Sequence, residues 1–254
     1  MDTYTLVVSN PPHEKDVDAS QAAPCFGLTA ADVRMKTNYV APEIWLAGTD
    51  RSKLEDAAQT LRETGLNVMV IEGRDLANIP GPARVKSFSF TDTYLVATLE
   101  DIEVGLPYVA HIVAVFCKAP EGSPAEVTQP TGSAVLDIYG SRKGELLRMS
   151  FVQEVVNFSG LGNLKLPTAD GNMLKFVGEC EQRFTKVQFD RRLEDVRVRR
   201  SLIIDTAARP PHEERKGFSY ATTALATLLE SISPDLKDIS QFELGSRLAY
   251  LTKQ

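Results

Sequence analysis

The sequence predicts an α+β protein of two domains: a small β-α-α-β-α-β sandwich at residues 1–80 and a strand-rich domain closed by helices at residues 83–254. Its 254 residues are enough for two domains of ordinary size. Apolar runs alternate with helical periodicity up to residue 73, and strand-like runs follow one another beyond it. Between the two regions lies Asn78-Ile79-Pro80-Gly81-Pro82, which has the composition of a linker.

The first domain is most clearly defined at residues 42–72, where a strand, a helix and a second strand follow one another. The runs at residues 43–47 and 68–71 are apolar, and a glycine closely follows each of them. Between the two runs, Thr49 or Asp50 can cap a helix. The apolar positions of that helix recur at the spacing of one helical face: Leu54, Ala57, Ala58 and Leu61.

Three further elements precede this unit. Residues 3–8 are strand-like, residues 14–23 are weakly helical, and residues 29–38 have the pattern of a helix that begins at Thr29. The resulting β-α-α-β-α-β order predicts a three-stranded sheet with its helices on one face.

The strand at residues 43–47 is apolar on both faces, which a sheet with one face in water does not require. Strict alternation places Ile44 and Leu46 on one face and Trp45 on the other. We therefore expect Trp45 to be covered by the second domain or by another chain, and we count it as a candidate binding residue.

The first third of the chain resembles the C-terminal domain of the bacterial ribosomal stalk protein, a fold shared by the Clp-protease adaptor. The resemblance rests on four segments: Gly27-Leu28-Thr29-Ala30-Ala31-Asp32-Val33, Ala41-Pro42, residues 50–65 and Val68-Met69-Val70. In that family the helix that starts with Gly-Leu docks translation factors through a basic face. Here the matching exposed cations are Arg34 and Lys36, with Asp32 among them. The hinge and dimerisation region of the stalk protein do not appear in this sequence, so the resemblance implies the fold and not the ribosomal function.

The second domain is predicted from successive strand-like runs and later helices. The strand-like runs lie at residues 85–90, 94–99, 106–117, 134–139, 145–151 and 152–158, with another at 196–204. Helical patterns lie at residues 172–184, 221–232 and 242–251. Antiparallel strands followed by a helix are reminiscent of a pleckstrin-homology-like domain.

Bulk composition bears on location and partners. The net charge of −6 gives no overall field that attracts nucleic acid or an anionic membrane. The longest apolar run, residues 106–117, is too short to span a bilayer, and the first residues lack a basic leader segment. The three cysteines, Cys25, Cys117 and Cys180, form no CxxC pair and are typical of a reducing compartment. We expect a cytoplasmic protein with no membrane partner and no cofactor.

Two short repeats raise the question of a metal. Pro-Pro-His-Glu occurs at residues 11–14 and again at residues 210–213. If the fold brings His13, Glu14, His212 and Glu213 together, they can ligate a metal ion and support a metal-dependent hydrolase. The simpler interpretation is a repeated loop composition, which predicts no bound metal. The third histidine, His111, lies in an apolar run and is expected in the core.

Residues 183–200 form the most basic stretch. Seven cations outnumber three carboxylates, giving a net charge of +4: Arg183, Lys186, Arg191, Arg192, Arg197, Arg199 and Arg200 against Asp190, Glu194 and Asp195. Such a stretch can hold an acidic or phosphate-bearing partner. Only Phe184 and Phe189 are available for stacking on bases, so nucleic acid is a weak hypothesis. We expect these arginines to face solvent or a partner.

These observations favour a non-catalytic protein, an interaction or adaptor module whose partner is another protein. The sequence contains no P-loop and no nucleophile elbow. The candidate binding residues are Arg34, Lys36, Trp45, Arg191, Arg192, Arg197, Arg199 and Arg200. Two alternatives remain open, the metal-dependent hydrolase and the anion or nucleic-acid binder.

Overall fold

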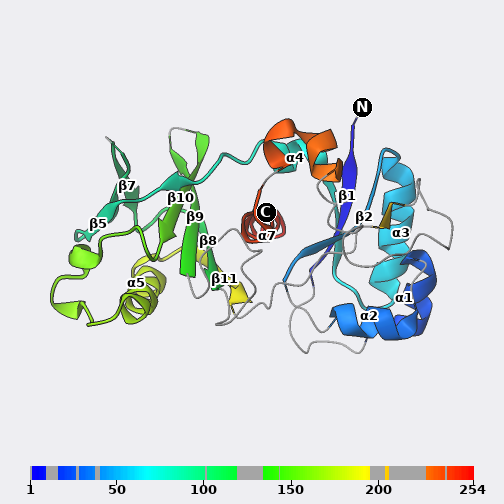
Figure 1. The fold of residues 1–254 in the computed structure, drawn as a ribbon, viewed down its shortest axis with the longest axis horizontal. Helices are drawn as coiled ribbons and strands as arrows, with labels where there is room; N and C mark the ends of the chain where they lie inside the picture. Colours follow the sequence, from blue (N-terminus) through cyan, green and yellow to red (C-terminus); the bar gives the residue numbers. More distant parts are fainter. Residues whose placement is uncertain are drawn as a thin grey trace. The chain divides into compact units, whose positions relative to one another are not determined.

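A computed structural model describes most of the chain and divides it into two compact units. The described residues are 2–9, 17–26, 29–37, 41–100, 102–118, 134–142, 144–194, 204–205, 227–237 and 239–254. Apart from the last two residues, the first unit consists of Met1–Asn78 and Val198–Thr252, and the second of Ile79–Arg197 (Figure 1). Helices and strands occur in both units, which confirms the predicted α+β class.

The first unit is built on a four-stranded sheet in the order β12-β2-β1-β3. Strand β1 pairs antiparallel with β2 and β3, and β12 pairs parallel with β2. The predicted β-α-α-β-α-β order is confirmed, but the prediction of three strands is wrong because β12 comes from the far end of the sequence. The elements are β1 (Tyr4–Val8), α1 (Ala19–Phe26), α2 (Ala30–Thr37), β2 (Glu43–Gly48), α3 (Arg51–Glu63), β3 (Val68–Glu72) and β12 (Ile204–Asp205).

Helices α1, α2 and α3 cover one face of this sheet. The start of α3 is fixed by Asp50, whose carboxylate accepts a hydrogen bond from the Lys53 backbone N–H at 3.3 Å. Its predicted apolar stripe packs into the core, with Leu54, Ala58 and Leu61 buried. The α3 stripe was therefore predicted correctly from its spacing.

The opposite face is covered by α4 and by segments from late in the chain. Its core contains Val7, Ile44 and Ile71 from the sheet together with residues from α4 (Gly73–Ala77), the helical residues 227–232, η3 (Pro234–Leu236) and α7 (Gln241–Leu251): Leu76, Leu229, Leu236, Leu244 and Leu248. The prediction of helices on one face only is therefore wrong. The strands are apolar on both faces because each face of the sheet packs against helices.

Trp45 is buried, but on the face shared with α1 to α3. In the β1–β2 pairing, Leu6 faces Leu46 while Val7 faces Ile44, so the register shifts and Trp45 is the extra residue of a β-bulge. Trp45 and Leu46 consequently pack in one core and Ile44 in the other. The predicted face of Trp45 was wrong because the bulge breaks the alternation on which that prediction relied.

The second unit contains two sheets. The five-stranded sheet has the order β11-β8-β9-β10-β4, and the three-stranded sheet has the order β5-β6-β7. Pairs β11–β8 and β10–β4 are parallel, which contradicts the pleckstrin-homology-like interpretation because that rested on antiparallel strands. The strands are β4 (Ala83–Arg84), β5 (Ser87–Phe90), β6 (Tyr94–Thr98), β7 (Glu103–Pro107), β8 (Ile112–Lys118), β9 (Ala134–Arg142), β10 (Glu145–Val152) and β11 (Val187–Glu194).

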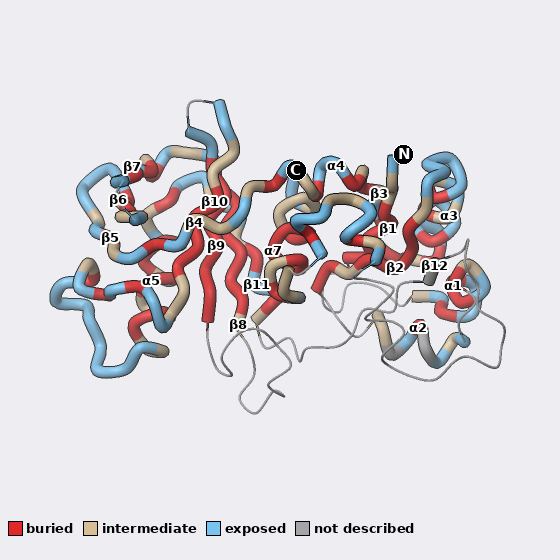
Figure 2. Tube along the Cα trace, turned by 45° about the horizontal axis from the view of Figure 1, so that its top comes forward, coloured by how far each residue is buried: buried red, intermediate tan, exposed pale blue. Residues whose placement is uncertain are grey.

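An aromatic cluster joins the two sheets of this unit to α5 (Ala169–Arg183) and the 3-10 segment η1 (Phe158–Leu164). The Phe88 ring centroid lies 4.3 Å from that of Phe176 and 6.3 Å from that of Phe158. Gly160 makes this packing possible, because a Cβ there would overlap the carbonyl oxygen of Phe88. Figure 2 shows the central strands β8 and β9 of the five-stranded sheet largely as buried residues.

Several predicted boundaries need correction. The predicted break near residue 80 agrees with the two units, but a continuous second domain over 83–254 does not, since 198–252 belongs to the first unit. The apolar run 106–117 is two strands separated by a turn, and residues 152–158 extend no strand beyond Val152. The predicted strand at 196–204 falls almost wholly outside the described residues.

Candidate interaction surfaces

Lys36 and Trp45 contact each other inside the first unit. The Lys36 Nζ lies 5.0 Å from the centroid of the Trp45 ring and 3.4 Å from a Glu43 carboxylate oxygen. The Trp45 ring packs edge-to-face on Phe26, with centroids 4.9 Å apart, and is 3% exposed. Lys36 is therefore not the exposed cation that was predicted, and Trp45 is covered by helices of its own unit and not by the second domain or another chain. Arg34 is exposed on α2 and remains a candidate.

The basic stretch begins with arginines that are paired to carboxylates. The Arg183 Nε donates to Glu179 at 3.1 Å. Arg191 donates to Glu181 and Glu194, both at 3.1 Å, and its guanidinium lies 5.1 Å from the Phe189 ring centroid. A polyanion would have to displace these glutamates, so the described arginines offer little free positive charge.

Arg192 differs from Arg191 because its partner is buried. Its Nε donates to one oxygen of Asp190 at 3.0 Å and to the other at 2.9 Å, and its Nη2 donates to that second oxygen at 2.5 Å. The Asp190 side chain is 1% exposed. The prediction that the whole stretch faces solvent or a partner is therefore wrong at this residue. Arg197, Arg199 and Arg200 lie outside the described residues.

The structure does not describe the four residues on which the metal hypothesis depends. His13, Glu14, His212 and Glu213 all lie outside the described residues. Within the part of the chain that is described, His, Cys, Asp and Glu form no cluster of three or more able to hold a metal ion. His111 is exposed in the turn before β8, which corrects its predicted place in the core.

The cysteines are unpaired, and two of them are fully buried. Burial raises the pKa of the Cys180 thiol on α5, and burial also raises the pKa of the Cys117 thiol on β8, with a further contribution from the nearby Asp137 carboxylate. Both groups therefore stay protonated thiols, which are poor nucleophiles and poor metal ligands.

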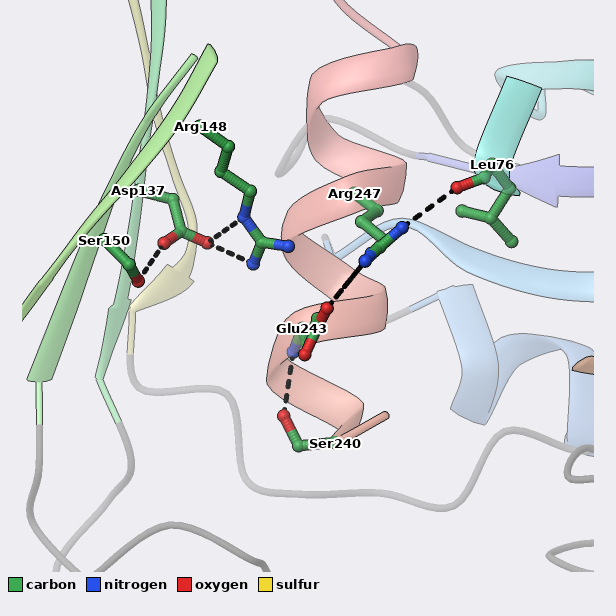
Figure 3. Close-up of polar contacts among 7 residues, drawn as sticks. All are labelled: Leu76, Asp137, Arg148, Ser150, Ser240, Glu243 and Arg247. Carbon is green, nitrogen blue, oxygen red and sulfur yellow. Dashed lines mark hydrogen bonds and ion pairs between the residues drawn. The ribbon is translucent and has the colours of Figure 1, made fainter. Parts of the chain in front are cut away.

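A buried ion pair links β9 to β10 (Figure 3). The Arg148 Nε and Nη2 donate to one oxygen of Asp137 at 3.2 and 2.7 Å, and the Ser150 hydroxyl donates to the other oxygen at 2.5 Å. Asp137 and Ser150 are directly opposite in the antiparallel pairing. The sequence shows only isolated charges within apolar strands, and their pairing depends on a register that the sequence does not reveal.

A second arginine joins two segments of the first unit (Figure 3). Arg247 on α7 donates to the Leu76 carbonyl of α4 at 3.1 Å and to the Glu243 carboxylate at 2.8 Å. The Ser240 hydroxyl accepts from the Glu243 backbone N–H at 3.0 Å and caps α7. This arginine therefore fastens the C-terminal helix to the N-terminal half of its unit.

Strand β3 forms one edge of the first unit's sheet. The Ser9 N–H donates to the Asn67 carbonyl at 2.9 Å, and the Gly73 N–H donates to the Thr3 carbonyl at 2.7 Å. Since antiparallel strands alternate between bonded and non-bonded pairs, the odd-numbered residues of β3 bond to β1. The even-numbered residues direct their backbone N–H and C=O groups away from the sheet.

The outward backbone groups of β3 are only partly covered. The Val68 carbonyl accepts a hydrogen bond from the Arg62 Nε at 3.0 Å. Within the described residues, no hydrogen bond reaches the outward N–H or C=O of Val70. Met69 beside it is 36% exposed. The sequence predicts β3 as a strand but does not reveal that it lies at an edge.

The edge formed by β7 is protected in a way that β3 is not. Hydrogen bonds from Tyr108 to Thr93 at one end and from Leu99 to Ile102 at the other set the same alternation. As a result, the backbone groups of Glu103, Gly105 and Pro107 point away from β6, towards the open side of the sheet. A charge, a glycine and a residue without an N–H are features that discourage strand pairing.

The other sheet edges are short, covered or irregular. Strand β5 is flanked by Asn157, whose N–H donates to the Lys86 carbonyl at 2.7 Å and which bridges to Ser87. Strands β4 and β12 have two residues each, and β11 contains a register shift and two arginines. Among the described edges, β3 is the regular one with neither proline nor glycine, and its one charged residue, Glu72, is at its end.

No family model, no curated protein and no solved structure matches the chain. The resemblance of the first third to the ribosomal stalk domain therefore stays a prediction. No helix in the described part of the chain combines the length and apolar character needed to cross a bilayer.

Proposed function

We propose that this protein is a non-catalytic interaction module that binds another polypeptide by strand addition at the β3 edge. The observation that supports this is the outward N–H and C=O of Val70, to which no described residue bonds, in a strand of sequence Val-Met-Val-Ile-Glu. An exposed strand edge is a template for pairing with another chain. In such complexes the backbone bonds give affinity and alternate side chains give specificity.

The alternatives draw less support from the structure. Among the described cations of the basic stretch, Arg183, Arg191 and Arg192 each have a carboxylate partner, which disfavours a nucleic-acid or phosphate ligand. The hydrolase depends on four residues outside the described chain. A cytoplasmic location is part of the proposal, because a reducing compartment keeps unpaired cysteines such as Cys25 as thiols.

A photo-crosslinking amino acid at position 69 tests the proposal in the full-length protein inside cells. We expect a discrete cross-linked adduct, because Met69 lies on the proposed docking edge. The same group at Val109, which is 65% exposed on the second unit, serves as the control and should give no such adduct.

A proline at position 70 identifies the kind of contact. Val70→Pro removes an outward N–H that is not used within the sheet, and edge strands tolerate proline at such positions. The adduct from position 69 should disappear while the circular dichroism spectrum is retained. No adduct from position 69, or an adduct unaffected by Val70→Pro, would overturn strand addition.

A further inference from the structure

We infer that the β3 edge pairs with the β3 edge of a second copy of this chain, antiparallel and centred on Val70. This rests on the proposed function, because it names the partner of the same surface. The starting point is that β3 is one of the two edges of its sheet and has no described strand on its outer side. The other edge, β12, is only two residues long.

The backbone of β3 is self-complementary about Val70. An antiparallel copy brings Val70 opposite the same residue of the second copy, so that each N–H donates to the other C=O. A two-fold axis through this point uses the same patch on both chains, as isologous dimers do. The pairing joins two four-stranded sheets into one continuous sheet.

The side chains agree with this register. Met69, which is 36% exposed, would lie opposite Ile71 of the second copy and lose its exposed surface. Val68 would lie opposite Glu72, and Val70 opposite its own equivalent. No pair of like charges is placed directly opposite, which is the arrangement that destabilises paired strands.

The other described edges fit a second copy less well. An antiparallel copy of β7 centred on Gly105 would place Glu103 opposite Pro107, which has no N–H to donate. Self-pairing of β11 would bring its arginines and its register shift into the ladder. Of these edge strands, β3 is therefore the one that can pair symmetrically without a missing N–H donor, opposed arginines or a register shift.

The association should be weak. The strand has five residues, and the Val68 carbonyl is already bonded to Arg62, so few new backbone bonds form per copy. A contact of this size is smaller than that of a typical stable dimer. We expect a monomer–dimer equilibrium that depends on concentration.

Sedimentation velocity of the purified full-length protein measures this equilibrium over about 1 µM to about 1 mM, the range of weak association. The weight-average mass should rise from that of one 27.9 kDa chain towards twice that value. Met69→Lys adds a charge to the edge and should weaken the dimer by about tenfold or more, or abolish it. Val109→Lys adds the same charge at an exposed site on the second unit and should leave the dimer unchanged.

The outcome distinguishes the partner from the proposed function. If the purified protein stays monomeric over the whole range, self-pairing is wrong. If the photo-crosslinker at position 69 then joins the chain to a different protein in cells, strand addition stands with another partner. If position 69 gives no adduct either in cells or with purified protein, both the dimer and the proposed function fail.

Discussion

Arg191 and Arg192 show how much neighbouring residues of one strand can differ. The Arg191 side chain is 40% exposed and pairs with two partly exposed glutamates. The Arg192 side chain is 15% exposed and neutralises Asp190, which is buried. Removing one partner of a buried pair leaves an unpaired charge in the interior, whereas removing one partner of a surface pair returns the other to water.

Two single substitutions test this difference. Arg192→Ser should lower the free energy of unfolding by about 3–5 kcal/mol, because it leaves Asp190 without its main counter-charge. Arg191→Ser should lower it by no more than about 1 kcal/mol. Urea denaturation followed by circular dichroism measures both. Equal losses for the two variants would contradict the burial of the Asp190 pair.

At the scale of single elements, the sequence pattern correctly predicted those features that depend on residues close together in the chain. The α3 stripe followed from spacing, and its start followed from the capping Asp50. Strand β11 was missed because four of its eight residues, Val187–Glu194, are charged and because β9, β10 and α5 separate it in sequence from its partner β8. The face of Trp45 was missed because one extra residue in β2 changes the alternation, and that insertion is defined only by the pairing with β1.

Helix α5 contains a carboxylate whose ionisation contributes to stability. Glu179 accepts hydrogen bonds from Lys175 at 3.0 Å and Arg183 at 3.1 Å. The bond from Lys175 lowers the pKa of Glu179, burial opposes that change, and the bond from Arg183 adds to the lowering. Because the folded pKa lies below the unfolded one, this stabilisation is present above the ordinary pKa of about 4.3 and is lost as pH falls through the folded value.

Glu179→Gln should therefore destabilise the protein in a pH-dependent way. We expect a loss of roughly 0.5–1 kcal/mol at neutral pH, the size of two helical ion pairs. At pH 3 the loss should be smaller than at neutral pH, because the stabilisation decreases as the pH falls below the ordinary pKa of about 4.3 towards the lower folded pKa. Urea denaturation at the two pH values measures this. An equal loss at both would show that packing and not charge is responsible.

At the scale of the whole molecule, the sequence predicted two units but not how the chain is shared between them. The linker composition near residue 80 located one boundary correctly. Nothing in the local pattern of residues 227–251 indicates which sheet they cover, since an apolar stripe fits any apolar face. Their assignment to the first unit depends on contacts with Val7, Ile44 and Ile71, which are far away in sequence.

Trp45 provides a test of this assignment because it is the only tryptophan and belongs to the first unit. Leu248→Ala, at a residue 1% exposed, should lower the free energy of the unfolding transition seen by Trp45 fluorescence by about 2–5 kcal/mol. Leu174→Ala, at a residue 42% exposed on α5, should shift that transition little. If Leu248→Ala left the Trp45 transition unchanged, the C-terminal helix would not be part of the first unit.

The split first unit has a consequence for biosynthesis. Translation delivers β1, β2 and β3 before the second unit, but four of the five buried leucines that cover their second face come at residues 229–248. At about 5–20 residues per second, the ribosome needs roughly 10–35 s to travel from residue 78 to residue 248. Throughout that interval the second unit can emerge and fold, while Val7, Ile44 and Ile71 of the nascent sheet have only Leu76 of α4 from their final cover of leucines. The first unit is thus begun before the second unit and completed after it.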